Sequence, residues 1–318
     1  MVIDKKYIEL FTNVTARAAY GAYLHKGKND KIAADQAAVD HMRSELNKID
    51  IKGKVVIGEG EMDEAPMLYI GEQVGNKSGP EVDIAVDPLE GTNFAAKNLP
   101  NALAVMAVSK KGNLLQAPDI YMEKIAIGKN LPKNLLDLDN TVEKNIKLLS
   151  EAKGVNPDKL TACLLKRDRH NNIIKSLESM NVNIKFLTDG DVSGVLFVAD
   201  KNKNVDIYLG TGGGPEGVLA AAALSCLDCQ MQTRLVYENN EQKDKAKKLG
   251  ISDLEKKYSI DEMVKGDVIF CASGVTNGDF VQGIKEVGDS FESETLVLHK
   301  SSNFYKIIKK KLDKNIYK

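Results

Sequence analysis

The spacing of apolar positions predicts two amphipathic helices at the start of the chain, followed by short buried strands. Apolar residues recur every three or four positions over residues 7–24, and a second helix is expected over residues 32–46. Apolar runs at 54–57 and 82–86 have the length of buried strands rather than that of helices. The chain is therefore expected to begin with two helices whose apolar faces pack against a sheet.

A short helix and a hairpin-rich sheet are expected next. Asp63 is suited to cap a helix that ends near Gln73, with Pro66 in its first turn. Residues 102–109 and 121–127 are strand-like, and a Lys-Gly-Asn turn follows the first of them. This pattern predicts an antiparallel sheet.

The second half alternates strand-like and helix-like segments, a rhythm typical of a parallel, doubly wound α/β unit. The expected elements are, in order, 160–165, 171–180, 184–187, 192–198, 205–209, 217–226 and 232–237. Apolar runs at 267–272 and 294–298 are expected to rejoin a sheet, and the lysine-rich residues 306–318 are expected to form a solvated helix face. A polar stretch with Gly and Pro predicts a boundary between two domains, 1–155 and 156–318.

Charge and composition exclude several classes of protein. The 44 basic and 45 acidic residues nearly cancel, so the overall charge does not favour binding to nucleic acid or to an anionic membrane. No apolar run has the length of a membrane span, and the N-terminus lacks a secretion-signal pattern, so a cytoplasmic location is expected. Four cysteines are too few for a disulfide framework. The four histidines lack the spacing of a zinc site, so carboxylates are the expected metal ligands.

Four acidic residues follow the ends of two predicted strands. Glu59 and Glu61 come after the first strand, and Asp87 and Glu90 come after the second, within Asp-Pro-Leu-Glu-Gly-Thr. Strand ends are where α/β sheets place ligands, and converging like charges would repel each other without a cation between them. Oxygen ligands select hard ions, so the cluster predicts a Mg²⁺ or Mn²⁺ site with Thr92 turned inward. A solvated acidic loop is the alternative.

A glycine-rich loop at residues 209–217 lies between a predicted strand and an alanine-rich helix. Such a loop can bind an anion through its backbone N–H groups, and its glycines also fit the Gly-x-Gly-x-x-Gly dinucleotide pattern. Pro215 and Glu216 disfavour a dinucleotide, because a rigid ring and a negative charge would stand where the pyrophosphate must approach. Glu216 is therefore expected to be a further metal carboxylate.

Two more loops carry groups suited to a phosphorylated sugar. Arg167 and Arg169 stand just ahead of a predicted helix, where charge and helix dipole together favour a phosphate group. Asp189 and Asp191, on either side of Gly190, can accept hydrogen bonds from sugar hydroxyls. Taken alone, the first pattern also fits a surface charge run, and the second fits an ordinary turn.

These motifs resemble those of class II fructose-1,6-bisphosphatases of the GlpX type. The resemblance covers roughly residues 15–279, and it rests on Gly-Glu-Gly-Glu-Met-Asp-Glu-Ala-Pro-Met at 58–67, Asp-Ile-Ala-Val-Asp-Pro-Leu-Glu-Gly-Thr at 83–92, Ala-Pro-Asp-Ile-Tyr-Met-Glu-Lys at 117–124 and Gly-Gly-Pro-Glu-Gly at 213–217. The resemblance implies an α/β sugar-phosphatase fold, a layered α-β-α-β-α sandwich of two domains. The first domain would be an α+β metal-binding domain, and the second an α/β domain with the substrate-binding loops.

The resemblance also implies an activity: metal-dependent hydrolysis of the 1-phosphate of fructose 1,6-bisphosphate, a step of gluconeogenesis, with two or more Mn²⁺ or Mg²⁺ ions. The implied metal ligands are Asp35, Glu59, Asp87, Glu90 and Glu216. The implied substrate contacts are Glu90, Gly91, Thr92, Tyr121, Arg167, Asp168, Arg169, Asp189, Gly190, Asp191 and Gly213. Lys31, Glu61, Asp63 and Thr92 are the candidate catalytic residues.

One position departs from the family pattern, and other interpretations remain open. The family commonly has Lys-Pro-Arg-His or Arg-Pro-Arg-His where this chain has Arg-Asp-Arg-His, so Asp168 puts a negative charge beside the expected distal phosphate. The alternatives are a sedoheptulose-1,7-bisphosphatase or dual-specificity enzyme, an inositol-type monophosphatase, an NAD-dependent oxidoreductase and a non-catalytic phosphosugar sensor. The expected partners are a small phosphorylated sugar and, as in relatives, a second copy of the chain in a dimer, with no nucleic acid and no membrane.

Overall fold

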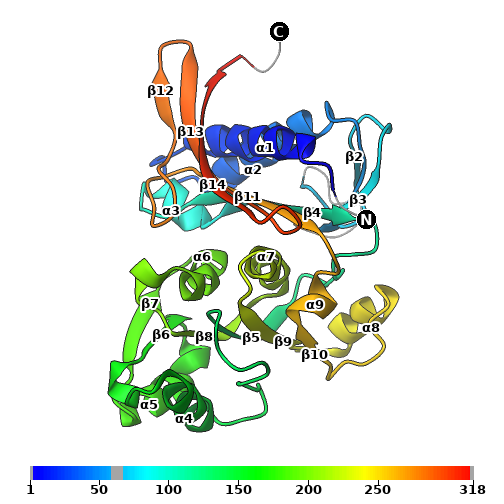
Figure 1. Cartoon of the computed structure of the whole chain (residues 1–318). Coiled ribbons are helices and arrows are strands. Elements are labelled where there is room, and N and C mark those ends of the chain that lie inside the picture. Colours follow the sequence, from blue (N-terminus) through cyan, green and yellow to red (C-terminus); the bar gives the residue numbers. More distant parts are fainter. Residues whose placement is uncertain (1–2, 59–66, 316–318) are drawn as a thin grey trace. The chain divides into compact units, whose positions relative to one another are not determined.

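The computed structural model describes residues 3–58 and 67–315. The chain divides into two compact units, Met1–Leu115 with Lys265–Lys318, and Gln116–Val264 (Figure 1). These units differ in extent from the domains predicted at 1–155 and 156–318, because late strands pair in the sheet of the early ones. The predicted division by function stays a prediction.

The first unit begins with two helices that pack against each other and cover one face of its sheet (Figure 1). They are α1 (Lys6–Tyr23) and α2 (Lys31–Leu46), and both confirm the predicted helices. Phe11, Val14 and Ala18 recur at helical spacing and are all buried, which explains why this face turns to the core.

Within the described residues, the sheet of the first unit has eight strands in the order β12-β13-β11-β4-β3-β1-β2, with β14 also paired to β13. The strands are β1 (Lys52–Ile57), β2 (Gln73–Val74), β3 (Glu81–Glu90), β4 (Leu103–Lys110), β11 (Val268–Gly274), β12 (Lys285–Val287), β13 (Ser290–His299) and β14 (Phe304–Asp313). β1 and β3 run parallel, whereas β3, β4, β11 and β13 form an antiparallel series. The late apolar runs therefore do rejoin a sheet, as predicted. α3 (Thr92–Ala96) follows β3 directly.

Two local predictions in this unit are wrong. The lysine-rich C-terminal stretch forms β14 rather than a helix, because it pairs along the whole length of β13. Phe304, Ile308 and Leu312 pack against the core from this strand. Residues 67–72 form no helix: they contain a turn in which Glu72 N donates to Tyr69 O (3.1 Å), and Gly71 N donates to Val55 O on β1 (2.8 Å). The predicted cap Asp63 lies outside the described residues.

A buried carboxylate joins the start of the chain to the returning strands. Asp267 precedes β11 and accepts hydrogen bonds from Ile3 N (2.8 Å), Ser301 N (2.9 Å), and the side chains of Ser301 and His299 (both 3.0 Å). Burial alone would raise the pKa of Asp267, but these hydrogen bonds together hold it below its usual value. The carboxylate is therefore ionised at neutral pH, and both of its oxygens accept hydrogen bonds.

The sheet of the second unit has six strands in the order β10-β9-β5-β8-β6-β7. The strands are β5 (Tyr121–Ile127), β6 (Thr161–Leu165), β7 (Asn183–Leu187), β8 (Ile207–Gly213), β9 (Gln230–Leu235) and β10 (Lys257–Ser259). β6 runs parallel to β7 and β8, whereas β5 is antiparallel to both β8 and β9. The prediction of a fully parallel sheet is therefore wrong in part, and β5 does not share a sheet with β4.

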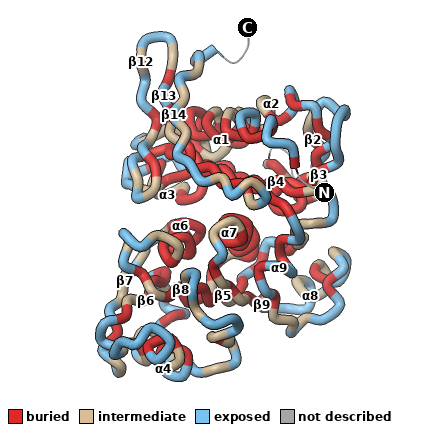
Figure 2. Tube along the Cα trace, viewed as in Figure 1, coloured by how far each residue is buried: buried red, intermediate tan, exposed pale blue. Residues whose placement is uncertain are grey.

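Helices lie on both faces of this second sheet (Figure 1). α4 (Val142–Lys153) and α5 (Asn171–Ser179) lie on one face, and α6 (Asp191–Leu196) and α7 (Gly214–Ser225) on the other. α7 is buried along nearly its whole length (Figure 2), as expected of a helix that is apolar on all sides. α8 (Asn240–Lys248) and α9 (Ile260–Met263) complete the unit.

Each unit combines a sheet with helices that cover it, as in the predicted α/β class. One sheet carries helices on one face and the other sheet carries them on both. No helix within residues 3–58 and 67–315 combines the length and the apolar character needed to cross a membrane.

Candidate active site

The buried strand β3 ends in an irregularity that brings two carboxylates together. Asp87 lies opposite Val105 and Glu90 lies opposite Leu103, so β3 uses three steps where β4 uses two. Residues an odd number apart point to opposite faces of a regular strand, so Asp87 and Glu90 would diverge without this bulge. Pro88 lies within it and cannot donate to a sheet ladder. The bulge therefore re-aims one acidic side chain.

Both acidic side chains are buried, which is unusual for carboxylates. Asp87 is 9% exposed and Glu90 is 4% exposed. Leu89 N donates to Asp87 Oδ1 (3.1 Å) and fixes that side chain. A bound cation is one group that can offset the cost of burying two carboxylates so close together.

Gly91 turns the chain out of β3 and into α3. Its φ of +80° is in the left-handed region, and a Cβ there would lie 2.8 Å from the Phe94 ring. Phe94 N donates to Gly91 O (2.8 Å) and closes the turn. Thr92 is therefore placed immediately after Glu90 as the first residue of α3, half-buried.

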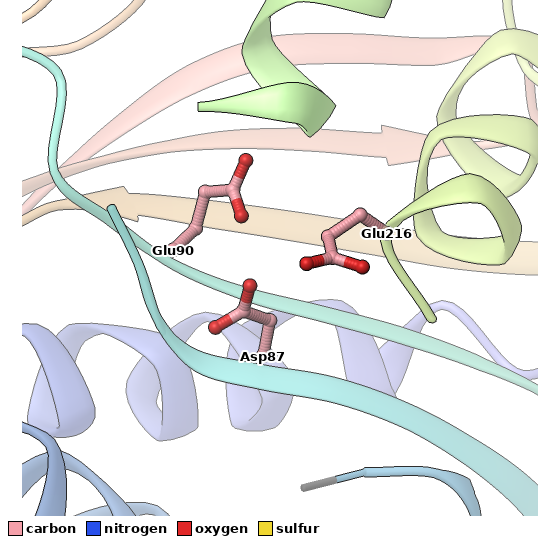
Figure 3. A group of neighbouring side chains, drawn as sticks. All are labelled: Asp87, Glu90 and Glu216. Carbon is pink, nitrogen blue, oxygen red and sulfur yellow. The ribbon is translucent and has the colours of Figure 1, made fainter. Parts of the chain in front are cut away.

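Three carboxylates form a group that could hold a metal ion. Asp87, Glu90 and Glu216 each offer one oxygen, and these oxygens lie within 4.8 Å of one another (Figure 3). Asp87 and Glu90 come from the end of β3, and Glu216 comes from the first turn of α7. A set of hard oxygen donors fits a divalent cation such as Mg²⁺ or Mn²⁺.

The other predicted metal and catalytic residues are less fully placed. Lys31 is the exposed first residue of α2, and Asp35 is half-buried one turn further along it. Glu59, Glu61 and Asp63 lie outside the described residues. The roles of all five stay predictions.

The predicted substrate contacts that belong to the second unit gather at one edge of its sheet. β6, β7 and β8 run parallel, so the loops that follow them emerge at the same edge. Residues 167–169 follow β6, residues 189–191 follow β7 and lead into α6, and Gly213 ends β8. The antiparallel β5 begins at the same edge with Tyr121, directly opposite Gly213. The Arg169 guanidinium stacks on the Tyr121 ring, 4.6 Å from its centre.

Backbone carbonyls orient the two arginines at this edge. Arg169 Nε donates to Thr211 O (2.9 Å), and Arg167 Nη1 donates to Thr188 O (2.8 Å). Asp168 between them is exposed. The edge therefore presents a fixed pair of guanidinium groups, with one negative charge between them.

The glycine loop makes room for acidic side chains of its own unit. A Cβ at Gly212 would overlap the Asp191 carboxylate, and a Cβ at Gly213 would overlap that of Glu216. These glycines therefore stand against carboxylates, which is the wrong charge to receive a pyrophosphate. This packing argues against the dinucleotide interpretation.

Sequence reasoning missed a buried lysine at this loop. Lys124 pairs with Asp191, and Tyr208 OH donates to the same carboxylate. The pKa of Glu216 is raised above its usual value, chiefly because the side chain is buried. The nearby Lys124 charge opposes this rise, and the Asp191 charge adds to it. The sequence does contain a sign of this lysine. Alternate residues of a strand face the same side, so Lys124 lies on the same side of β5 as Met122 and Ala126, which are buried.

His170 joins the ends of two strands in this unit. Its Nδ1–H donates to Leu165 O (2.7 Å), and its Nε2 accepts from Thr211 N (2.8 Å). Burial lowers the pKa of His170, so the ring is neutral at pH 7. Both ring nitrogens are engaged with backbone, which gives His170 a structural role.

We expect this histidine to make the protein less stable in mild acid. Because its folded pKa lies below the unfolded value, its contribution is complete above about pH 6.5 and is lost as the pH falls below that. Urea unfolding between about pH 7.5 and about pH 5 should show a flatter pH dependence for His170→Gln than for His25→Gln. Equal slopes in the two variants would contradict the expectation.

Known proteins resemble this chain over most of its length. The family model described as "Bacterial fructose-1,6-bisphosphatase, glpX-encoded" matches residues 5–312. A class 2 fructose-1,6-bisphosphatase of Escherichia coli (strain K12) is 40% identical over 305 residues, covering 92% of this chain and 90% of that protein. The class 2 enzyme of Haemophilus influenzae is 39% identical over 305 residues, covering 92% and 91%. A protein of Synechococcus sp. (strain JA-2-3B'a(2-13)), named D-fructose 1,6-bisphosphatase class 2/sedoheptulose 1,7-bisphosphatase, is 38% identical over 331 residues, covering 96% and 95%.

The chain therefore belongs to the family of glpX-encoded bacterial fructose-1,6-bisphosphatases. Membership confirms the predicted family, its sugar-phosphatase fold and the predicted enzyme class, a phosphoric monoester hydrolase. The Synechococcus relative carries both substrate names, in keeping with the predicted alternative substrate.

Proposed function

We propose that the protein hydrolyses the 1-phosphate of fructose 1,6-bisphosphate, releasing fructose 6-phosphate and phosphate in gluconeogenesis. The observation that carries this proposal is the group of carboxylate oxygens at the end of β3 and the start of α7, in a chain of this family. Oxygen donors of this kind suit a phosphatase, because a divalent cation can bind them and the phosphoryl group together.

The proposed metal ligands are Asp35, Glu59, Asp87, Glu90 and Glu216. When bound, Mg²⁺ or Mn²⁺ would screen the phosphoryl charge and acidify a water for in-line attack. Thr92, set beside Glu90 by the turn at Gly91, orients that water together with Glu61 or Asp63. Lys31 contributes positive charge near the reacting phosphate. Water is the proposed nucleophile, so no phospho-enzyme forms.

The far phosphate is assigned to the edge of the second sheet. Arg167 and Arg169 are held by backbone carbonyls, so their guanidinium groups lose little freedom when they bind a phosphate. Tyr121 supports Arg169 by stacking. Asp168 weakens the local positive charge and makes this contact the proposed determinant of which bisphosphate is preferred.

Sedoheptulose 1,7-bisphosphate is the second candidate substrate, favoured by the name of the Synechococcus relative. A cytoplasmic homodimer remains the expectation.

Phosphate release tests the proposal. Fructose 1,6-bisphosphate, sedoheptulose 1,7-bisphosphate and inositol 1-phosphate are each incubated with the protein and Mn²⁺, Mg²⁺ or excess chelator. We expect metal-dependent release that favours the fructose substrate and stops with the chelator. Release from the sedoheptulose substrate alone would keep the metal site and change the substrate. No release from folded, metal-loaded protein would overturn the proposal and favour a phosphosugar sensor.

A further inference from the structure

An ion pair lies inside the second unit, beneath the loops assigned to the substrate. Lys124 on β5 is 1% exposed and pairs with Asp191, the first residue of α6. Tyr208 on β8 donates its hydroxyl to the other oxygen of the same carboxylate and is also buried. Three elements of the unit therefore meet at one carboxyl group.

Asp191 has little capacity left for a ligand. Each of its oxygens already accepts a hydrogen bond, and the residue is 6% exposed. Asp189 differs, because it is half-buried and accepts a local hydrogen bond from Gly190 N (3.2 Å). Of the two acidic residues predicted to bind sugar hydroxyls, Asp189 is the one still able to do so.

The surrounding backbone is fitted to this ion pair. A Cβ at Gly212 would overlap the Asp191 carboxylate and lie 3.0 Å from Lys124 Nζ. A Cβ at Gly217 would overlap the Met122 sulfur and lie 3.0 Å from Lys124 Cε. The glycine loop therefore approaches the ion pair as closely as backbone can, so the position of the loop depends on where Lys124 and Asp191 lie.

We propose that Lys124 is a positioning residue that acts through Asp191, and that Asp191 itself does not bind the sugar. The Lys124–Asp191–Tyr208 network fixes the turn that presents Asp189 and Gly190, and it fixes the strand end that presents Gly213. Asp189 then supplies the carboxylate contact to the sugar. This inference rests on the proposed function, because it assigns substrate-binding work to the loops the network holds.

Steady-state kinetics of the full-length protein with saturating Mn²⁺ test the proposal. Lys124→Met should raise KM for fructose 1,6-bisphosphate about tenfold or more while kcat changes by less than about threefold, because misplaced loops weaken binding of the substrate. Lys175→Met is the matched control, since Lys175 is an exposed lysine of α5 in the same unit, and it should match wild type. Asp189→Asn should also raise KM, without loss of resistance to urea.

A double variant separates positioning from plain stability. Lys124→Met alone leaves a buried, unpaired carboxylate and should also lower the urea midpoint. Lys124→Met combined with Asp191→Asn removes that charge, so the midpoint should recover. KM should stay raised, because the lysine no longer holds the side chain at position 191 and the Tyr208 hydroxyl alone remains to orient the neutral amide. Tyr208→Phe should give a smaller rise in KM.

Results other than these would overturn either the positioning role of Lys124, the sugar contact of Asp189 or the proposed function. Recovery of KM in the double variant would show that the ion pair serves stability alone and would overturn the positioning role. An unchanged KM in Asp189→Asn would overturn the assignment of the sugar contact. Wild-type protein that releases no phosphate from either bisphosphate would overturn the proposed function and this inference together, whereas active wild type with Lys124→Met equal to Lys175→Met would overturn the inference alone.

Discussion

Glu90→Gln is expected to reduce kcat for phosphate release by about a hundredfold to a thousandfold, the largest effect we predict on activity. The substitution keeps the volume of the side chain and replaces an anionic oxygen donor by an amide, which binds Mg²⁺ and Mn²⁺ poorly. Glu90 is buried at the bulge of β3, so no solvent-exposed carboxylate can take its place. Phosphate release at several Mn²⁺ concentrations measures the loss.

The same variant should change stability in opposite directions with and without metal. The three carboxylates of Figure 3 repel one another when no cation is bound, so metal-free Glu90→Gln should resist urea better than metal-free wild type. Mn²⁺ at about a hundredfold excess over its Kd should stabilise wild type by about 2.7 kcal/mol and stabilise the variant less. Glu81→Gln, at the exposed start of the same strand, is the control and should leave activity unchanged. Equal stabilisation of both proteins by Mn²⁺ would remove Glu90 from the metal site.

Asp267→Ala is expected to lower the free energy of unfolding by about 3–5 kcal/mol, the largest effect we predict on stability. The substitution leaves Ile3 N, Ser301 N and the buried His299 ring without their acceptor. Urea unfolding at neutral pH measures the loss, and kcat of the folded fraction should not change. Asp40→Ala, on the exposed face of α2, should change stability by less than about 0.5 kcal/mol.

The pH dependence gives this prediction its sign. The folded pKa of Asp267 lies below its unfolded value, so its contribution is complete above about pH 4 and is lost as the pH falls through the folded pKa. The stability difference between wild type and Asp267→Ala should therefore shrink in acid. A difference that stays constant down to about pH 2 would mean that the carboxylate acts by packing alone.

The elements that the sequence predicts well are those whose periodicity is decided locally. The helices over α1 and α2 and the apolar strand of β3 follow from the spacing of their side chains. β14 could not be predicted in this way, because its lysines fit a solvated helix as well as an edge strand, and pairing with β13 decides between them. The direction of β5 is likewise set by its neighbours in the sheet, β8 and β9, which lie far along the chain.

In the candidate site, too, the features decided by local sequence could be predicted, and those decided by distant strand pairing could not. Asp87 and Glu90 could be predicted from their place after an apolar run, but the bulge that aligns them depends on pairing with β4. The grouping at the edge of the second sheet follows from parallel strands, which the alternating rhythm predicted for β6, β7 and β8. Lys124 was missed because its partner Asp191 lies 67 residues away along the chain. A single buried charge in a strand indicates a partner without saying which.

The first sheet is assembled from both ends of the chain, and this bears on how the protein forms during synthesis. Unit Gln116–Val264 is one continuous stretch, so it can close around its own core as soon as it leaves the ribosome. The early strands β3 and β4 must wait for β11 and β13, which emerge more than 150 residues later. Until then, the buried carboxylates at the end of β3 belong to an incomplete sheet with an open edge. A nascent chain of this protein therefore completes the unit that holds its N-terminus last, and that unit is the one most exposed to aggregation before release.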